Sequence, residues 1–184
     1  MKISSFTKKE SYQILLILMV VLVATLANLR VSYRKSRDAQ RKQDLRQFSD
    51  IAGKYYEDYE HFPFAKDGKI MVCNRHIDDK RATIFEPCSA GQDGSPYTKM
   101  IPADPKNSDG YKYLYVSNGK QFQIYGALEG KSEDEYNEIV ESLGLDCGVK
   151  KCNFGLASDN TPLEKPVNEI TNPYDYNILN TDGN

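Results

Sequence analysis

The sequence predicts an α+β protein: one long N-terminal helix, membrane-spanning at its start, packs on a small antiparallel sheet, and a short C-terminal helix and a flexible tail follow. Three observations predict it. Residues 14–29 form one uncharged, largely apolar run, residues 30–62 contain no proline and have a helical pattern, and two β-prone runs follow at 111–117 and 121–127. The expected segments are a leader or cytoplasmic segment at 1–10, a transmembrane helix at 11–30, its amphipathic continuation at 31–62, a small globular domain at 63–157 and a flexible tail at 158–184.

The apolar run is the expected membrane anchor, with lipid as its first partner. A membrane span usually needs about 17–25 residues, and Tyr12, Gln13 and Val31 can extend the run at its two ends. A cleaved signal peptide is the alternative. Its small-residue cleavage site is not evident, because helix-favouring sequence continues through Ala24 and Ala27. We therefore expect an anchor that is retained.

A block of basic residues follows the apolar run. Its members are Arg30, Arg34, Lys35, Arg37, Arg41, Lys42 and Arg46. We expect this block to be a solvated helix face beside lipid headgroups, and the positive-inside rule, taken alone, would place it in the cytoplasm. No nucleic-acid partner is expected, because no interleaved aromatic residues accompany the block and the net charge of the chain is only -2.

The cysteines favour the opposite orientation. Cys73, Cys88, Cys147 and Cys152 form an even set with no histidine at metal-ligand spacing, which is typical of disulfides in an oxidising compartment. Zinc would require tighter cysteine pairs, and four reduced core cysteines are the other alternative. Of the three pairings, proximity in the sequence favours Cys73–Cys88 and Cys147–Cys152.

The second part of the long helix is amphipathic. Apolar residues recur in steps of three and four, which places them on one face. The members of this core stripe are Leu45, Phe48, Ala52, Tyr55, Tyr59 and Phe62. We expect the stripe to pack on the globular domain, with a short coiled coil as the alternative, and Pro63 to end the helix.

The globular domain contains a predicted hairpin and a predicted short helix. The two β-prone runs meet across Asn118-Gly119-Lys120, a typical hairpin loop. We expect Leu114 and Val116, with Phe122 and Ile124, to cover the core stripe, and the tyrosines to lie on the wetter side.

The short helix is expected to begin at Ser132, which has capping-box spacing to Glu135. Its expected buried face comprises Tyr136, Ile139, Val140 and Leu143. Gly144 fits the C-terminal cap of this helix.

Three groups of residues resemble one protein family. The first is residues 6–10, Phe-Thr-Lys-Lys-Glu, ahead of the apolar run, where the mature chain of the family opens with Phe and has Glu at its fifth position. The second is the charged stretch 37–45, followed by a tyrosine-rich helix end. The third is Pro-Ala-Asp-Pro at 102–105, followed by Tyr-Lys-Tyr at 111–113. Over roughly 6–127 the chain resembles the type IV pilin-like proteins, in particular the major pseudopilin of type II secretion.

The resemblance implies a structural subunit of a type IV pilus-like or type II secretion pseudopilus filament. Its partners would be copies of itself, other pilin-like subunits and a prepilin peptidase. The peptidase would cut between Ser5 and Phe6, and Glu10 would neutralise the new amino terminus of Phe6 in an adjacent subunit. The N-terminus would be cytoplasmic, and the globular domain extracytoplasmic, in the periplasm or at the cell surface. The chain departs from the family pattern in having Ser5 where the family has Gly, and Lys8 and Lys9 in the otherwise apolar start.

No enzyme is expected, and no cofactor or metal. His61 and His76 are the only histidines, and none of the common catalytic or nucleotide-binding motifs occurs. Asp104, Ser108 and Asp109 could supply oxygens to calcium, but they do not match the family's calcium loop. Two other functions stay open: a monomeric membrane-anchored extracytoplasmic binding module, and a minor pilin that primes filament assembly.

Overall fold

The computed structural model describes residues 7–75 and 84–167. The chain divides into two compact units, Met1–Arg37 and Asp38–Asn184. We call the described part of the first unit the helical segment and that of the second the head. Helix α1 (Lys8–Tyr59) contributes to both units, and the strands and the other helices belong to the head. The fold class is α+β, as the sequence predicts.

The helical segment begins with a reciprocal cap. The backbone N–H of Thr7 donates to Glu10 Oε2 at 2.8 Å, and the backbone N–H of Glu10 donates to Thr7 Oγ1 at 3.4 Å. This arrangement is a capping box, which satisfies two N–H groups at a helix start. The helix that follows is long and apolar enough to cross a membrane, by length and composition, and none of its most apolar window is buried.

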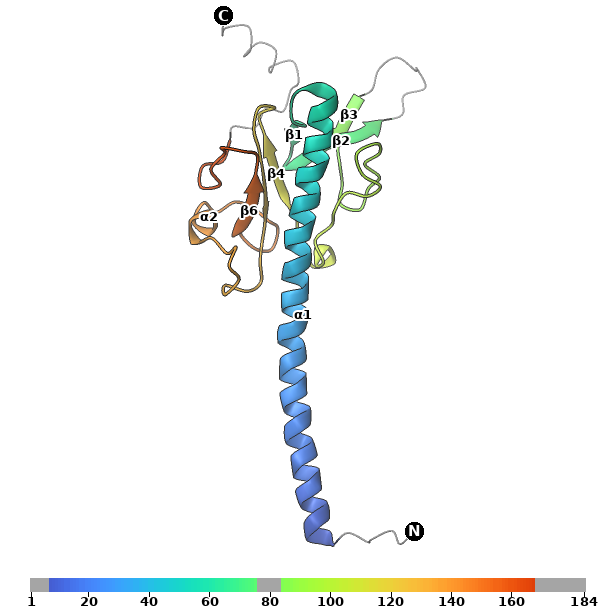
Figure 1. The fold of residues 1–184 in the computed structure, drawn as a ribbon, viewed down its shortest axis with the longest axis vertical. Coiled ribbons are helices and arrows are strands. Elements are labelled where there is room, and N and C mark those ends of the chain that lie inside the picture. The colour runs from blue at the N-terminus through green and yellow to red at the C-terminus, as the bar shows by residue number, and fades with distance from the viewer. Residues whose placement is uncertain (1–6, 76–83, 168–184) are drawn as a thin grey trace, which may run out of the picture. The chain divides into compact units, whose positions relative to one another are not determined.

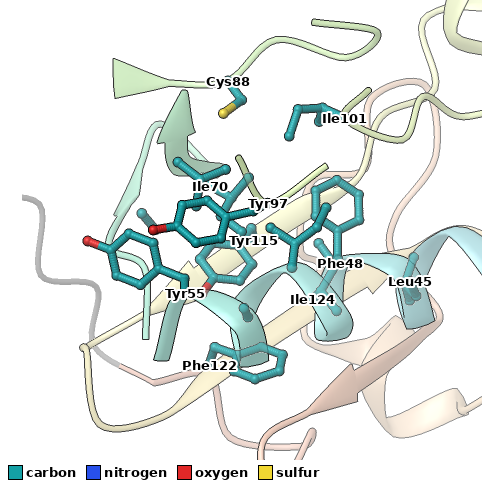
Figure 2. Packing of buried hydrophobic residues seen from close by; sticks show 14 of the residues in the cluster. Leu45, Phe48, Tyr55, Ile70, Cys88, Tyr97, Ile101, Tyr115, Phe122 and Ile124 are labelled. Carbon is teal, nitrogen blue, oxygen red and sulfur yellow. The ribbon is translucent and has the colours of Figure 1, made fainter. Parts of the chain in front are cut away.

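In the head, α1 presents one apolar face to the core (Figure 2). Leu45, Phe48, Ala52 and Tyr55 of the predicted stripe are buried, and Ile51 joins them. Tyr59 is 41% exposed. The helix ends there because Glu60 adopts a left-handed conformation, with φ 59°.

Two three-stranded antiparallel sheets lie beside this part of α1 (Figure 1). One has the order β1 (Ala65–Lys66), β2 (Lys69–Arg75), β3 (Ile84–Pro87), and the other the order β4 (Leu114–Ser117), β5 (Phe122–Gly126), β6 (Phe154–Ala157). The backbone N–H of Tyr115 donates to the carbonyl of Gly68 at 2.9 Å, which links β4 to the β1–β2 turn. A 3-10 turn, η1 (Asn107–Asp109), precedes β4.

The predicted hairpin forms, but one of its strands faces the other way. Tyr115 pairs with Ile124, is 1% exposed and packs in the core beside α1. Leu114 and Val116 pack instead in a second cluster with Tyr125 on the opposite face. The prediction for the tyrosines was wrong because it assumed a wet second face, whereas that face is covered by the second cluster. Strand alternation then brings Tyr113 and Tyr115 to the α1 side, whereas Tyr125 of β5 lies in the second cluster.

The short helix begins later than the capping-box pattern predicts. Helix α2 (Glu138–Ser142) has Asn137 as its N-cap, and the Asn137 side chain accepts hydrogen bonds from the backbone N–H groups of Ile139 and Val140. Val140 is fully buried, whereas Ile139 is 56% exposed. Ser132 is therefore not the cap, because the amide side chain of Asn137 takes that role nearer the buried Val140.

Both disulfides favoured by proximity in the sequence are present. Cys73 bonds to Cys88, and Cys147 bonds to Cys152. All four cysteines are at most 3% exposed. Disulfides of this kind fit an oxidising, extracytoplasmic compartment.

The first residues of the predicted flexible tail are attached to the head. Gln123 is fully buried, and its Nε2 donates to the carbonyls of Pro162 at 2.6 Å and Lys165 at 2.9 Å. The hydroxyl of Tyr125 donates to the carbonyl of Leu163 at 2.9 Å. Residues 158–167 therefore cover one face of the second sheet, and the rest of the predicted tail, 168–184, lies outside the described residues.

Candidate functional site

The apolar surface of the helical segment is the first candidate site. From Ile14 to Leu29 every large hydrophobic side chain is exposed, with exposed fractions from 41% for Ile14 to 65% for Met19. Burying one such side chain is worth about 1.5–3 kcal/mol relative to water. A surface of this kind requires lipid or protein around it.

The predicted assembly residues lie at the start of this segment. Ser5 and Phe6 are outside the described residues. Glu10 is described, is exposed, and bonds through its carboxylate to Thr7 of its own chain. Sequence reasoning missed this cap, although Thr7-Lys8-Lys9-Glu10 has the capping-box spacing.

A buried ion cluster in the head is the second candidate site, and sequence reasoning missed it. Arg41 is fully buried. Its guanidinium binds both carboxylate oxygens of Asp104, with Nε to Oδ2 at 2.8 Å and Nη2 to Oδ1 at 3.1 Å. Its Nη1 donates to Asp38 Oδ1 and to Glu129 Oε1, each at 2.8 Å. The guanidinium also lies over the Tyr111 ring, 5.1 Å from its centroid.

The carboxylates of the cluster anchor two loops to α1. Asp38 accepts hydrogen bonds from the backbone N–H groups of Glu129 at 2.8 Å and Gly130 at 3.0 Å. Asp104 accepts one from the backbone N–H of Lys106 at 2.7 Å. One turn of helix thereby holds the segment before β4 and the segment after β5.

Hydrogen bonding keeps Arg41 charged in this setting. Burial opposes its charged form, but the hydrogen bonds to Asp104, Glu129 and Asp38 outweigh burial and raise the pKa of Arg41. Three carboxylates surround one guanidinium, and Lys106 Nζ lies 4.0 Å from Glu129 Oε2 at the edge of the cluster. Such a buried group fixes conformation, because removing one member leaves the others unpaired in a low-dielectric setting.

The cluster corrects two expectations from the sequence. Arg41 does not belong to a solvated block beside lipid headgroups. Asp104 does not gather with Ser108 and Asp109, since Asp104 binds Arg41 while Asp109 pairs with Lys106 at 3.6 Å. Among the described residues, no group of three or more His, Cys, Asp or Glu side chains could hold a metal ion. The available signal was Asp38-x-x-Arg41, a helical i, i+3 ion pair.

Asp44 extends the cluster toward the hairpin. The hydroxyl of Tyr113 donates to Asp44 Oδ2 at 2.5 Å, and the Tyr113 ring packs edge-on against Phe48, with centroids 5.8 Å apart. Burial raises the pKa of the Asp44 carboxyl, and the Tyr113 hydrogen bond opposes that shift.

His61 lies among aromatic rings at the end of α1. Its ring centroid is 4.9 Å from that of Phe64 and 5.5 Å from that of Tyr55. The Nδ1 atom is 2.9 Å from the carbonyl oxygen of Phe62. The other histidine, His76, lies outside the described residues.

Comparison with known proteins finds no match: no family model, no curated protein and no solved structure resembles this chain closely enough to assign it. The site must therefore be interpreted from its own chemistry.

Proposed function

We propose that this protein is a structural subunit of a pilus-like or pseudopilus-like filament, anchored in the membrane by α1 and assembled by packing of N-terminal helices. One observation carries the proposal. The chain combines a fully exposed apolar helical surface, residues 14–29, with a head whose cysteines are all in disulfides. The resemblance of residues 6–10, 37–45 and 102–113 to pilin-like proteins supports the same conclusion.

The apolar helix would exchange lipid for neighbouring helices during assembly. Lipid and neighbour are equally apolar, so close packing and polar contacts must favour association. Cleavage between Ser5 and Phe6 by a prepilin peptidase would create an amine that Glu10 of an adjacent copy could neutralise. Glu10 would then exchange its bond with Thr7 for this ion pair. A carboxylate left unpaired in lipid costs several kcal/mol, which favours subunits in register.

A cytoplasmic N-terminus and an extracytoplasmic head complete the proposal. The two disulfides support this orientation. The basic block opposes this orientation by the positive-inside rule. In the folded head, Arg41 is buried in the ion cluster, and Lys42 binds Glu133 at 2.9 Å and Glu135 at 2.5 Å.

Cysteine cross-linking in native membranes tests the proposal. Single cysteines placed in turn at residues 15–23 should form disulfide-linked dimers on mild oxidation, because the native cysteines are already paired and each chain then has one free thiol. A single cysteine at the exposed Lys120 in the hairpin loop is the matched control. Absence of cross-links at every position from 15 to 23, with normal membrane insertion, would overturn the filament function. Mass spectrometry of the mature chain adds an independent measurement, with a Phe6 amino terminus expected.

A monomeric membrane-anchored binding module is the second candidate function. Lys8, Lys9, Ser11 and Gln13 place polar groups at the helix start, where a membrane surface suits them better than a filament core. The head also has a cavity of about 360 Å³, with Phe48 and Ile101 among its lining residues. This function predicts no self-contact along the apolar helix, so the same cysteine scan distinguishes it. A minor pilin differs from a major subunit mainly in its abundance, which immunoblotting measures.

A further inference from the structure

The part of α1 just after the apolar run carries a strong positive charge. Residues 30–37 contain four cations and no acid, and we call them the basic segment. Arg30 and Arg34 are one helical turn apart, and Lys35 is exposed. The side chains of these three residues form no hydrogen bond or ion pair with any residue that the structure describes. Arg34 Nε is buried and lacks a partner within those same residues.

The head carries a surface of opposite charge around α2. We call it the acidic surface, and its carboxylates are those of Glu133, Asp134, Glu135, Glu138 and Glu141. Asp134 and Glu138 are exposed, and within residues 7–75 and 84–167 they have no ion-pair partner.

The acidic surface already binds one cation of α1. Lys42 Nζ lies 2.9 Å from Glu133 Oε2 and 2.5 Å from Glu135 Oε2. Lys131 lies 3.6 Å from Glu141. These five carboxylates face Lys42 and Lys131, and Arg46 and Lys150 also act electrostatically on Glu135 and Glu141, so the surface keeps a small excess of negative charge for further cations. The contact with Lys42 indicates the chemistry that this surface selects, a basic side chain presented by a helix.

Assembly creates a need for such a contact. While the apolar run is in lipid, headgroups can neutralise the basic segment. When neighbouring helices replace lipid around residues 14–29, the adjoining basic segments also approach one another. Like charges repeated in every subunit would repel, and opposite charges supplied by the neighbour remove that cost. Each copy carries both surfaces, so the contact can repeat from subunit to subunit.

We propose that the basic segment of one subunit docks on the acidic surface of a neighbouring copy, with Arg34 and Lys35 facing Asp134 and Glu138. This inference rests on the proposed filament function and names the second contact of the same assembly. Its partner is another copy of this chain, and the charge contact adds register to the non-directional packing of the apolar helices.

Heterotypic cross-linking tests the contact directly. Two differently tagged copies are co-expressed in the full-length background, one with Lys35→Cys and the other with Glu138→Cys. A short bismaleimide is then applied to isolated membranes. Pairing Lys35→Cys with Asp159→Cys, at an exposed acid of the head outside the acidic surface, is the matched control. We expect the first pair to cross-link about tenfold more than the control, and less at high salt, because screened charges attract weakly. Equal yields for the two pairs would overturn the proposal.

A charge exchange separates this contact from intrachain and lipid pairing. One copy carries Arg34→Glu and Lys35→Glu, the other carries Asp134→Lys and Glu138→Lys, and both carry the reporter cysteine of the 15–23 scan that cross-links best in the wild type. Contact between copies predicts about tenfold more mixed dimers than homotypic dimers, because each mixed contact restores opposite charges. Pairing within one chain, or with anionic lipid, predicts no preference for mixed dimers and would overturn the inference. Retention of both disulfides on non-reducing gels shows that the heads are folded.

The two proposals can fail separately. The charge contact alone would be overturned if the Lys35–Glu138 cross-link and the mixed-dimer preference were both lost while the cysteine scan of residues 15–23 still gave cross-links. Loss of all cross-links along residues 15–23 would overturn the filament function itself.

Discussion

Residues 14–29 and residues 38–59 belong to the same helix but have opposite surfaces. The first stretch exposes every large apolar side chain. The second buries an apolar stripe and, beside it, the fully buried guanidinium of Arg41. A helix can therefore use apolar residues for a lipid-compatible surface in one part and charged residues for a specific tertiary contact in the next. Hydropathy alone identifies the first part and misassigns the second.

Removing the first stretch should have the largest effect. A chain that begins at Asp38 retains the whole head, including Arg41 and both disulfides, and lacks the exposed apolar surface. We expect it to be a water-soluble monomer, because no large apolar helical face remains to be covered. Light scattering coupled to size-exclusion chromatography measures this. A truncated head that still forms multimers would contradict this prediction, because self-association would then depend on the head and not on the exposed apolar surface of residues 14–29.

Removing the charge at the centre of the head should be the next largest effect. Arg41→Met in the truncated chain leaves Asp38 and Asp104 buried without their partner. We expect the free energy of unfolding to fall by about 3–5 kcal/mol, since breaking a buried ion pair leaves an uncompensated charge. Urea denaturation measures the change.

Arg46→Met is the matched control for this substitution. Arg46 lies on the same helix and is exposed, so the same substitution should change stability by no more than about 0.5 kcal/mol. Similar losses for the two variants would mean that the ion cluster adds nothing beyond ordinary helix contacts.

The two disulfides should stabilise the head unequally. Cys73–Cys88 spans 15 residues and Cys147–Cys152 spans 5. Chain entropy predicts losses of about 3 and about 2 kcal/mol respectively when each cysteine pair is replaced by alanines, because the longer loop restricts the unfolded chain more. Denaturation of the two variants measures the order. A larger loss for the shorter loop would show that the Cys147–Cys152 turn stabilises the head through native contacts.

The long helix, the hairpin and both disulfides could be predicted because each depends on local pattern or proximity in the sequence. The 3.6-residue period placed Leu45, Phe48 and Ala52 on one face, and the Asn-Gly loop indicated the turn. The orientation of β4 could not be predicted, because it depends on whether the second sheet face is covered. That cover comes from Val140 and Leu163, which are distant in the sequence.

The ion cluster could not be predicted for a related reason. Arg41 and Asp104 are 63 residues apart, and their pairing depends on where the loops fold back on α1. A lone arginine after an apolar run is usually solvated, so charge counting assigned it to the membrane surface. Only its Asp38 partner, one turn away on the same helix, was visible locally.

The smallest expected effect concerns the ionisation of Asp44. Burial raises the pKa of this carboxyl above its ordinary value of 3.8, so the folded state holds its proton to higher pH than the unfolded chain does. The protonated Asp44 carboxyl therefore contributes fully to the free energy of unfolding below about pH 3.8, and this contribution is lost as the pH rises through the folded-state pKa. Asp44→Asn should abolish this loss. The free energy of unfolding of the variant minus that of the wild type should therefore increase, by less than about 1 kcal/mol, as the pH rises from 3.5 to 6.5.

Denaturation across that pH range, with Asp50→Asn at an exposed position of α1 as the control, measures the difference. An Asp44→Asn variant that becomes relatively less stable with rising pH would mean that the ionised carboxylate, held by the Tyr113 hydroxyl, stabilises the head. The ion cluster would then extend as a charged network to the hairpin. The head would be held to α1 by charge over a wider area than Arg41 alone provides, which would strengthen the contrast with the apolar part of the same helix.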